Sequence, residues 1–139
     1  MILKLWMATL LTLSALANFN GKWLGEGYYY THKSEGECHE VFFELQEDKD
    51  YFRIKTGGYN CSFMSAEYPS SHFKKKGEEL FYNGKKVGTI KDNQVSISYY
   101  DGVYKLDLMI DGKQLIFRED WAQDGSYLRL KSHLSRYVD

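Results

Sequence analysis

Glu119 is the side chain whose type and setting most suggest chemistry. It lies in the segment 117–121, between two aromatic residues that share its strand parity. A carboxylate on an apolar face is costly to bury unless it is paired. One interpretation is an anchor for a polar group of a ligand, helped by Tyr99 and Tyr104. The other interpretations are structural: an ion pair with Arg129, or a position open to water at the rim of the fold.

The two cysteines, Cys38 and Cys61, are the second chemical feature. A tight turn centred on Lys49-Asp50 forms a hairpin in which Cys38 falls opposite Cys61. Cross-strand neighbours are close enough for a disulfide. There is no Cys-x-x-Cys motif, so a structural disulfide is favoured over a redox role.

Motifs of the common catalytic sites are absent. The chain has no Gly-x-Ser-x-Gly elbow, no phosphate loop and no His-Glu-x-x-His segment. Its four histidines show no metal-binding spacing. The sequence therefore predicts a protein that is not an enzyme, without catalytic residues, a metal site or a cofactor.

The first 17 residues have the pattern of a secretory signal. Lys4 supplies a positive charge, the run from Leu5 to Leu16 is mostly apolar, and Ala15-Leu16-Ala17 is a typical cleavage site. The apolar run is too short to span a bilayer, so stable membrane insertion is not expected. We predict a signal peptide over 1–17, a single domain over 18–139, and a secreted or periplasmic protein.

Charge and composition narrow the partners further. The net charge is −1, and the longest run of like charge is Lys74-Lys75-Lys76, so a nucleic-acid partner is not expected. Aromatic residues make up 17% of the chain, 12 of them tyrosines, and there is one proline. This composition favours a β-rich fold with an aromatic interior.

Alternating hydrophobicity and turn dipeptides predict strands throughout the mature chain. Asn83-Gly84 is a strong type I′ turn signal, and Asp92-Asn93, Asp101-Gly102, Asp111-Gly112 and Asp124-Gly125 mark further hairpins. The exception is 62–71, which predicts a long loop or a short helical turn. The strand at 72–75 is weak, and we expect any gap in the sheet there.

The registers set by these turns place apolar residues on one face. Ile97 should oppose Leu106, and Leu106 should oppose Phe117, with polar residues on the other face. The inward set is Val95, Ile97, Tyr99, Tyr104, Leu106, Leu108, Leu115 and Phe117. About nine or ten antiparallel strands with one apolar face should close on themselves. The predicted fold is an all-β, antiparallel, up-and-down β-barrel.

The start of the first strand, Gly21-Lys22-Trp23, resembles that of the calycin group, which includes lipocalins, fatty-acid-binding proteins and avidins. The segment 21–27 is also similar to the opening of nitrobindin-like barrels. The resemblance implies a lipocalin-like barrel around one small apolar ligand, or haem in the nitrobindin case. It also implies that a basic residue of the last strand, Arg129, closes over Trp23. No helix is expected after the last strand, and no motif fixes an axial histidine.

Two functional hypotheses of different classes follow. The first is an exported binding protein that holds a small hydrophobic or aromatic molecule inside the barrel. Its predicted lining residues are Tyr99, Tyr104, Phe117, Glu119, Phe43 and Ile54. The alternative is a packed barrel that acts on a protein partner through its surface, by way of the segment 62–71 and Phe42. A filled interior would favour the second hypothesis.

Overall fold

The computed structural model describes residues 18–138, and the signal peptide predicted over 1–17 lies outside them. Almost all of the described chain is β-strand. The strands are β1 (Gly21–Thr31), β2 (Glu35–Glu47), β3 (Tyr51–Cys61), β4 (Ser65–Tyr68), β5 (Ser71–Lys76), β6 (Glu79–Tyr82), β7 (Lys85–Lys91), β8 (Gln94–Tyr99), β9 (Tyr104–Asp111), β10 (Gln114–Gln123) and β11 (Ser126–Tyr137), with a 3₁₀ turn, η1 (Tyr100–Gly102), between β8 and β9.

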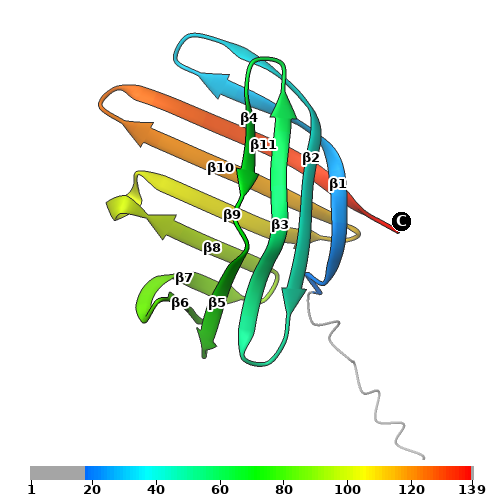
Figure 1. Ribbon diagram of the computed structural model, residues 1–139, viewed down its shortest axis with the longest axis vertical. Coiled ribbons are helices and arrows are strands. Elements are labelled where there is room, and N and C mark those ends of the chain that lie inside the picture. Colours follow the sequence, from blue (N-terminus) through cyan, green and yellow to red (C-terminus); the bar gives the residue numbers. More distant parts are fainter. Residues whose placement is uncertain (1–17, 139) are drawn as a thin grey trace, which may run out of the picture.

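Ten of these strands form one closed antiparallel barrel (Figure 1). Each pairs with its neighbours in sequence, except that β3 pairs with β5, and β1 closes the ring by pairing with β11. The remaining strand, β4, pairs with β3 alone and lies outside the ring. The prediction of an all-β, up-and-down barrel is therefore confirmed.

Turn chemistry explains how the later hairpins form. Asn83 and Gly84 both have positive φ, 51° and 78°, as a type I′ turn requires, and Tyr82 pairs with Lys85 across them. Asp124 and Gly125 repeat this geometry with φ of 52° and 81° between β10 and β11. The turn predictions at these two positions are confirmed.

The turn between β9 and β10 lies one residue later than predicted. Gln114 pairs with Asp111, so the loop is Gly112 and Lys113. As a result Leu108 faces Phe117, and Leu106 faces Glu119 instead of Phe117. The register moves by two residues, which preserves side-chain parity. The predicted inward set is accordingly buried, apart from Tyr99, which is half-buried.

Two β-bulges interrupt the β2–β3 hairpin. Leu45 pairs with Ile54 as expected, but the next pair is Glu44 with Thr56, so β3 contains one extra residue. A second irregularity between Cys38 and Glu40 adds one residue to β2. The two shifts cancel, and Cys38 pairs with Cys61 as predicted.

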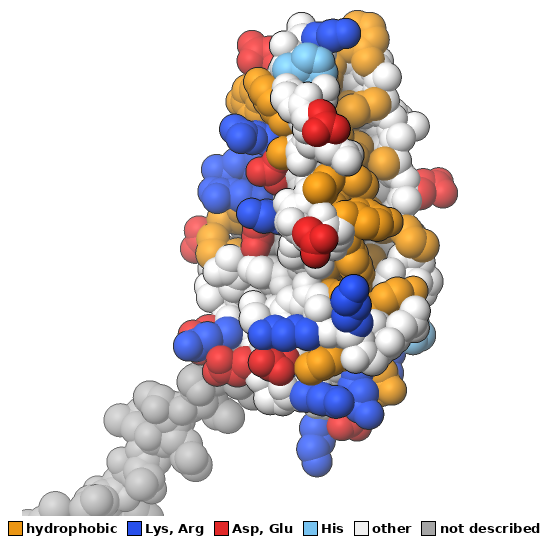
Figure 2. Space-filling view, turned by 90° about the vertical axis from the view of Figure 1, so that its left-hand side faces the viewer, with side chains coloured by type: hydrophobic (Ala, Val, Ile, Leu, Met, Phe, Trp, Pro, Cys, Tyr) orange, Lys and Arg blue, Asp and Glu red, His pale blue; other side chains and the backbone are white. Residues whose placement is uncertain are grey.

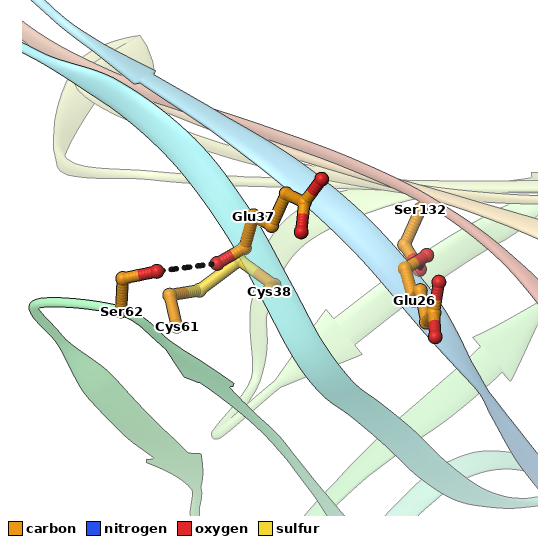
Figure 3. The surroundings of a disulfide bond; sticks show 6 residues. All are labelled: Glu26, Glu37, Cys38, Cys61, Ser62 and Ser132. Carbon is orange, nitrogen blue, oxygen red and sulfur yellow. Dashed lines mark hydrogen bonds between the residues drawn. A yellow bond between two sulfur atoms is a disulfide. The ribbon is translucent and has the colours of Figure 1, made fainter.

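The cysteines form a disulfide across this hairpin (Figure 3). Beside it, the Ser62 hydroxyl donates a hydrogen bond of 3.4 Å to the Glu37 carbonyl oxygen. The disulfide therefore joins β2 to β3 just before the chain turns into β4.

The segment 62–71 was predicted to be a long loop or a short helical turn, but it contains β4 and leads straight into β5. β4 pairs with β3 at 57–60, whereas β5 pairs with β3 at 51–54. The two strands are separated at Pro69, which cannot donate to a β-ladder. The prediction of a gap at 72–75 is wrong, because β5 is paired on both sides. Within the described chain, the edge without a strand partner belongs to β4.

Trp23 fills one end of the barrel. Its indole Nε1 donates a 2.9 Å hydrogen bond to the Phe19 carbonyl oxygen, and its side chain is fully buried. The guanidinium of Arg136 lies 4.4 Å from the centre of the Trp23 ring. The prediction for Arg129 is therefore wrong: Arg129 points outward, where it lies 3.7 Å from Asp120. Arg136 is seven residues further along the same strand and pairs directly with Trp23.

Candidate functional site: a tyrosine-lined cavity

A cavity of about 710 Å³ opens between β4 and the ends of β8, β9 and β10. Six of its lining residues are tyrosines: Tyr59, Tyr68, Tyr82, Tyr99, Tyr100 and Tyr104. Apolar side chains complete the wall: Ile54, Phe73, Ile97, Leu106 and Trp121. Figure 2 shows the side of the barrel that carries the β8–β9 and β10–β11 connections, and hydrophobic side chains gather on it in a band.

Glu119 lies at the inner wall of this cavity with only 4% of its surface exposed. Its Oε1 accepts a short hydrogen bond from the Tyr68 hydroxyl. The Tyr104 hydroxyl donates in turn to the Tyr68 hydroxyl over 3.3 Å. The second carboxyl oxygen, Oε2, is buried and accepts no hydrogen bond from any described residue.

The surroundings of Glu119 disfavour ionisation of the nearby phenols. Burial, and then the negative charge of Glu119, raise the pKa values of Tyr59, Tyr68 and Tyr104 well above the usual value for tyrosine. Burial raises the pKa of Tyr99 to about 12, with smaller effects from Tyr82 and Tyr100. At neutral pH these hydroxyls are therefore protonated and available as donors.

An aromatic cluster holds Tyr68 in place from behind. The ring centre of Phe43 lies 5.3 Å from that of Tyr68 and 4.9 Å from that of Phe117. Tyr68 and Phe117 meet edge to face at 6.3 Å. β4 thus contributes Tyr68 to the site, although it lies outside the closed ring.

The structure brings together four of the six predicted lining residues. Tyr99, Tyr104, Glu119 and Ile54 line the cavity. Phe43 and Phe117 do not; they are buried in the core behind Tyr68. Their role in ligand binding stays a prediction, as does that of the four lining residues.

Both structural interpretations of Glu119 are corrected. Arg129 pairs with Asp120, which points to the other face of β10, so it does not neutralise Glu119. Glu119 is also not at an open rim, because it is almost completely buried. Its partner in the fold is a tyrosine hydroxyl.

Sequence reasoning missed Tyr59 and Tyr68. Strict alternation from Ile54, which was predicted to point inward, places Tyr59 on the outer face. The bulge between Ile54 and Thr56 reverses this alternation, and the Tyr59 side chain is buried. The extra residue is Lys55, and the nearest signal was the pair Gly57-Gly58 just after it, since glycine in a strand often marks an irregularity. Tyr68 was missed because its segment was interpreted as a loop or a short helical turn.

The described residues offer no obvious place for a metal ion. Within 18–138, no three His, Cys, Asp or Glu side chains cluster closely enough to hold one. Nor does the described chain contain a helix long and apolar enough to cross a membrane.

No protein-family model and no curated protein matches this sequence. Among solved structures, the chain is similar to the S-type phycobiliprotein lyase CPES from Guillardia theta. The alignment covers 91% of this chain and 92% of that one, with 6% identity and a TM-score of 0.41. The closed ten-strand barrel itself fits the calycin-like fold that the first strand suggested.

This finding corrects the expectation that the chain is not an enzyme. A solved structure that aligns with 91% of this chain is named as a lyase. The absence of the common catalytic motifs therefore does not exclude an enzyme. At this level of similarity, the neighbour indicates neither a reaction nor a ligand for this chain.

Proposed function

We propose that this protein is an exported ligand-binding barrel, and that a small, largely apolar or aromatic molecule occupies the tyrosine-lined cavity. The observation that supports this most is the cavity of about 710 Å³, walled by aromatic side chains, with one buried carboxylate at its inner end. Small-molecule sites commonly occupy about 300–1,000 Å³ and combine apolar walls with a few polar groups.

Burial of apolar ligand surface is the proposed source of affinity. Each Å² removed from water contributes about 25 cal/mol, so about 200 Å² would supply about 5 kcal/mol before the costs of association. The hydroxyls of Tyr59, Tyr68 and Tyr104 and the carboxylate of Glu119 would then orient the molecule. Haem remains a less supported occupant, since no histidine lines the cavity within the described chain.

Export is supported by the disulfide and by the sequence of the first 17 residues. A Cys38–Cys61 bond persists in oxidising compartments and is rare in the cytosol. The signal peptide itself is a prediction from sequence. Native mass spectrometry of protein purified after export in its host would test both proposals, because it reports the cleaved mass and any bound molecule that leaves on denaturation.

A dye titration tests ligand binding directly. Nile red, an uncharged aromatic dye, should gain fluorescence on binding to the wild-type protein, and Ala66→Trp should reduce that gain because Ala66 lines the cavity from β4. Ser65→Trp is the matched control, since Ser65 is the exposed neighbour of Ala66 on the same strand. Absence of dye binding by the wild-type protein, or an equal loss in both variants, would contradict the proposal.

The alternative, a packed barrel that acts through its surface, has less support. It called for a filled interior, and the structure contains a large cavity. Phe42, one of its proposed contact residues, is half-buried, with its ring close to Gly58. A protein partner would become the better proposal if the dye failed to bind.

A further inference from the structure

The unpaired oxygen of Glu119 is the feature that the proposed function leaves unexplained. Its Oε1 is satisfied by Tyr68, whereas its Oε2 is buried without a hydrogen bond from any described residue. A buried acceptor without a donor costs about 1–3 kcal/mol, and more if it is charged. Because Glu119 lines the cavity, a bound molecule that reaches this oxygen could supply the missing donor.

The charge around this oxygen favours a cation. Among the described residues that line the cavity, the charged side chains are Glu67, Lys85 and Glu119, and of these only Glu119 is buried. None of the ion pairs found within 18–138 includes Glu119. Lys85 is exposed at the start of β7. Among residues 18–138, no buried positive charge balances the carboxylate.

The surrounding rings suit the same kind of ligand. Tyr59, Tyr68 and Tyr104 lie close enough to Glu119 for its charge to act on their hydroxyls, and their rings line the same cavity as that of Tyr99. The ring centre of Trp121 lies 4.6 Å from that of Tyr104. Cations bind favourably over electron-rich rings, and desolvated cages of this kind recognise ammonium groups. An ammonium N–H would also supply the donor that Oε2 lacks.

We infer that the cavity selects a protonated amine carried on an aromatic or apolar body, with its N–H donating to Glu119 Oε2 and its charge facing the tyrosine rings. This inference rests on the proposed function and adds the chemical class of the ligand. The apolar part of the molecule would lie against Ile97 and Leu106, and the ammonium would lie at the inner wall. A hydrogen bond to a charged group contributes enough to give at least about a tenfold preference over an uncharged analogue.

Displacement of Nile red by three matched probes tests the inference: a phenylbutylamine, the corresponding phenylbutanol and the corresponding phenylbutanoate. For the wild-type protein, the amine should compete at least about tenfold better than the alcohol, and the carboxylate should compete worst. In Glu119→Gln the amine should fall to within about threefold of the alcohol, while Nile red still binds. Glu26→Gln removes the same charge from the exposed face of β1 and should keep the wild-type order.

The outcomes separate the two proposals. If the wild-type protein binds Nile red but treats the amine and the alcohol alike, or prefers the carboxylate, the inference is overturned and the binding function stands. The inference is also overturned if Glu119→Gln keeps the full preference for the amine. Failure of the wild-type protein to bind Nile red would overturn both. The wild-type comparison decides even if Glu119→Gln does not fold.

Discussion

At the residue scale, the site depends on one buried carboxylate, and the fold compensates its lost hydration only in part. Glu119 replaces its lost hydration with a hydrogen bond from Tyr68, which is in turn supported by Tyr104. Such a network is stable only while its phenols stay protonated, because an ionised Tyr68 would face the carboxylate at short range. The stability of this hydrogen-bond network should therefore depend on pH in the alkaline range.

We expect the protein to lose stability as the pH rises above the usual tyrosine pKa of about 10. The sign follows from the raised pKa values: the unfolded chain ionises first, so the folded state binds more protons and its stability falls with pH. Below about pH 10 the effect is absent. Each buried phenol contributes at most about 1.4 kcal/mol per pH unit to the slope.

Urea unfolding from about pH 8 to about pH 11 measures this slope. Tyr68→Phe should be less stable than the wild type at pH 8, by about 1–3 kcal/mol, since Glu119 loses its donor. It should also lose less stability on the way to pH 11. Tyr28→Phe, with a ring that is 42% exposed outside the barrel, should keep the wild-type slope. A slope unchanged by Tyr68→Phe would contradict this assignment.

At the scale of the strands, the sequence predicted which residues of a regular strand point inward, but it did not predict the β-bulges. The period of two placed Val95, Ile97 and Leu108 on the inner face, and a two-residue register error between β9 and β10 left that result intact. A bulge changes parity by one residue, so a single missed bulge in β3 turned Tyr59 from an outward into an inward residue. Local sequence gives only a weak signal for such an insertion.

β4 was missed for a related reason. Its four residues are too few to show a period, and Pro69 ends it. What allows it to dock is the absence of a side chain at position 58 of β3: a Cβ on Gly58 would lie 2.4 Å from the Ala66 carbonyl oxygen. The close approach of β3 and β4 therefore requires glycine at position 58, and this in turn positions Tyr68.

Gly58→Ala should displace β4 without opening the barrel. The new methyl group must push the Ala66 backbone away, whereas the ten closed strands keep their own pairings. Hydrogen exchange should speed up by about tenfold or more for the amides of β4 and change little for those of β10. Nile red binding should weaken, because Ala66 and Tyr68 line the cavity.

Gly77→Ala is a useful comparison for that variant. Gly77 lies in a turn with a φ of +60° and has open space around it. The substitution should therefore cost only backbone strain, confined to the β5–β6 turn. Exchange in β4 should then stay at the wild-type rate. If Gly58→Ala also left β4 unchanged, close packing against β3 would not be what holds this strand.

At the scale of the whole molecule, closure of the barrel was predictable, because about ten antiparallel strands with one apolar face have few other ways to bury it. The residue that covers Trp23 was not predictable. Arg129 and Arg136 lie on the same strand, and only the register of β1 against β11 selects Arg136. The sequence predicted an interior site and four residues that line the cavity, but not the part of the wall that β4 supplies. The size of the cavity depends on β4 standing outside the ring, which is a three-dimensional result of the bulge, the glycines and Pro69.

The disulfide links β2 to β3, and its removal should lower the stability of the whole barrel. Cys38 and Cys61 are 23 residues apart, and a loop of that length predicts a loss of about 3 kcal/mol through the greater entropy of the unfolded chain. Cys38→Ala combined with Cys61→Ala should lower the urea midpoint accordingly. Wild-type protein treated with a reductant should match the double variant, and the double variant should not respond to the reductant. Because Asn60 pairs with Ser65, the loss should also loosen the start of β4. An unchanged midpoint would mean that β-pairing alone fixes this hairpin and that the bond adds nothing to the fold.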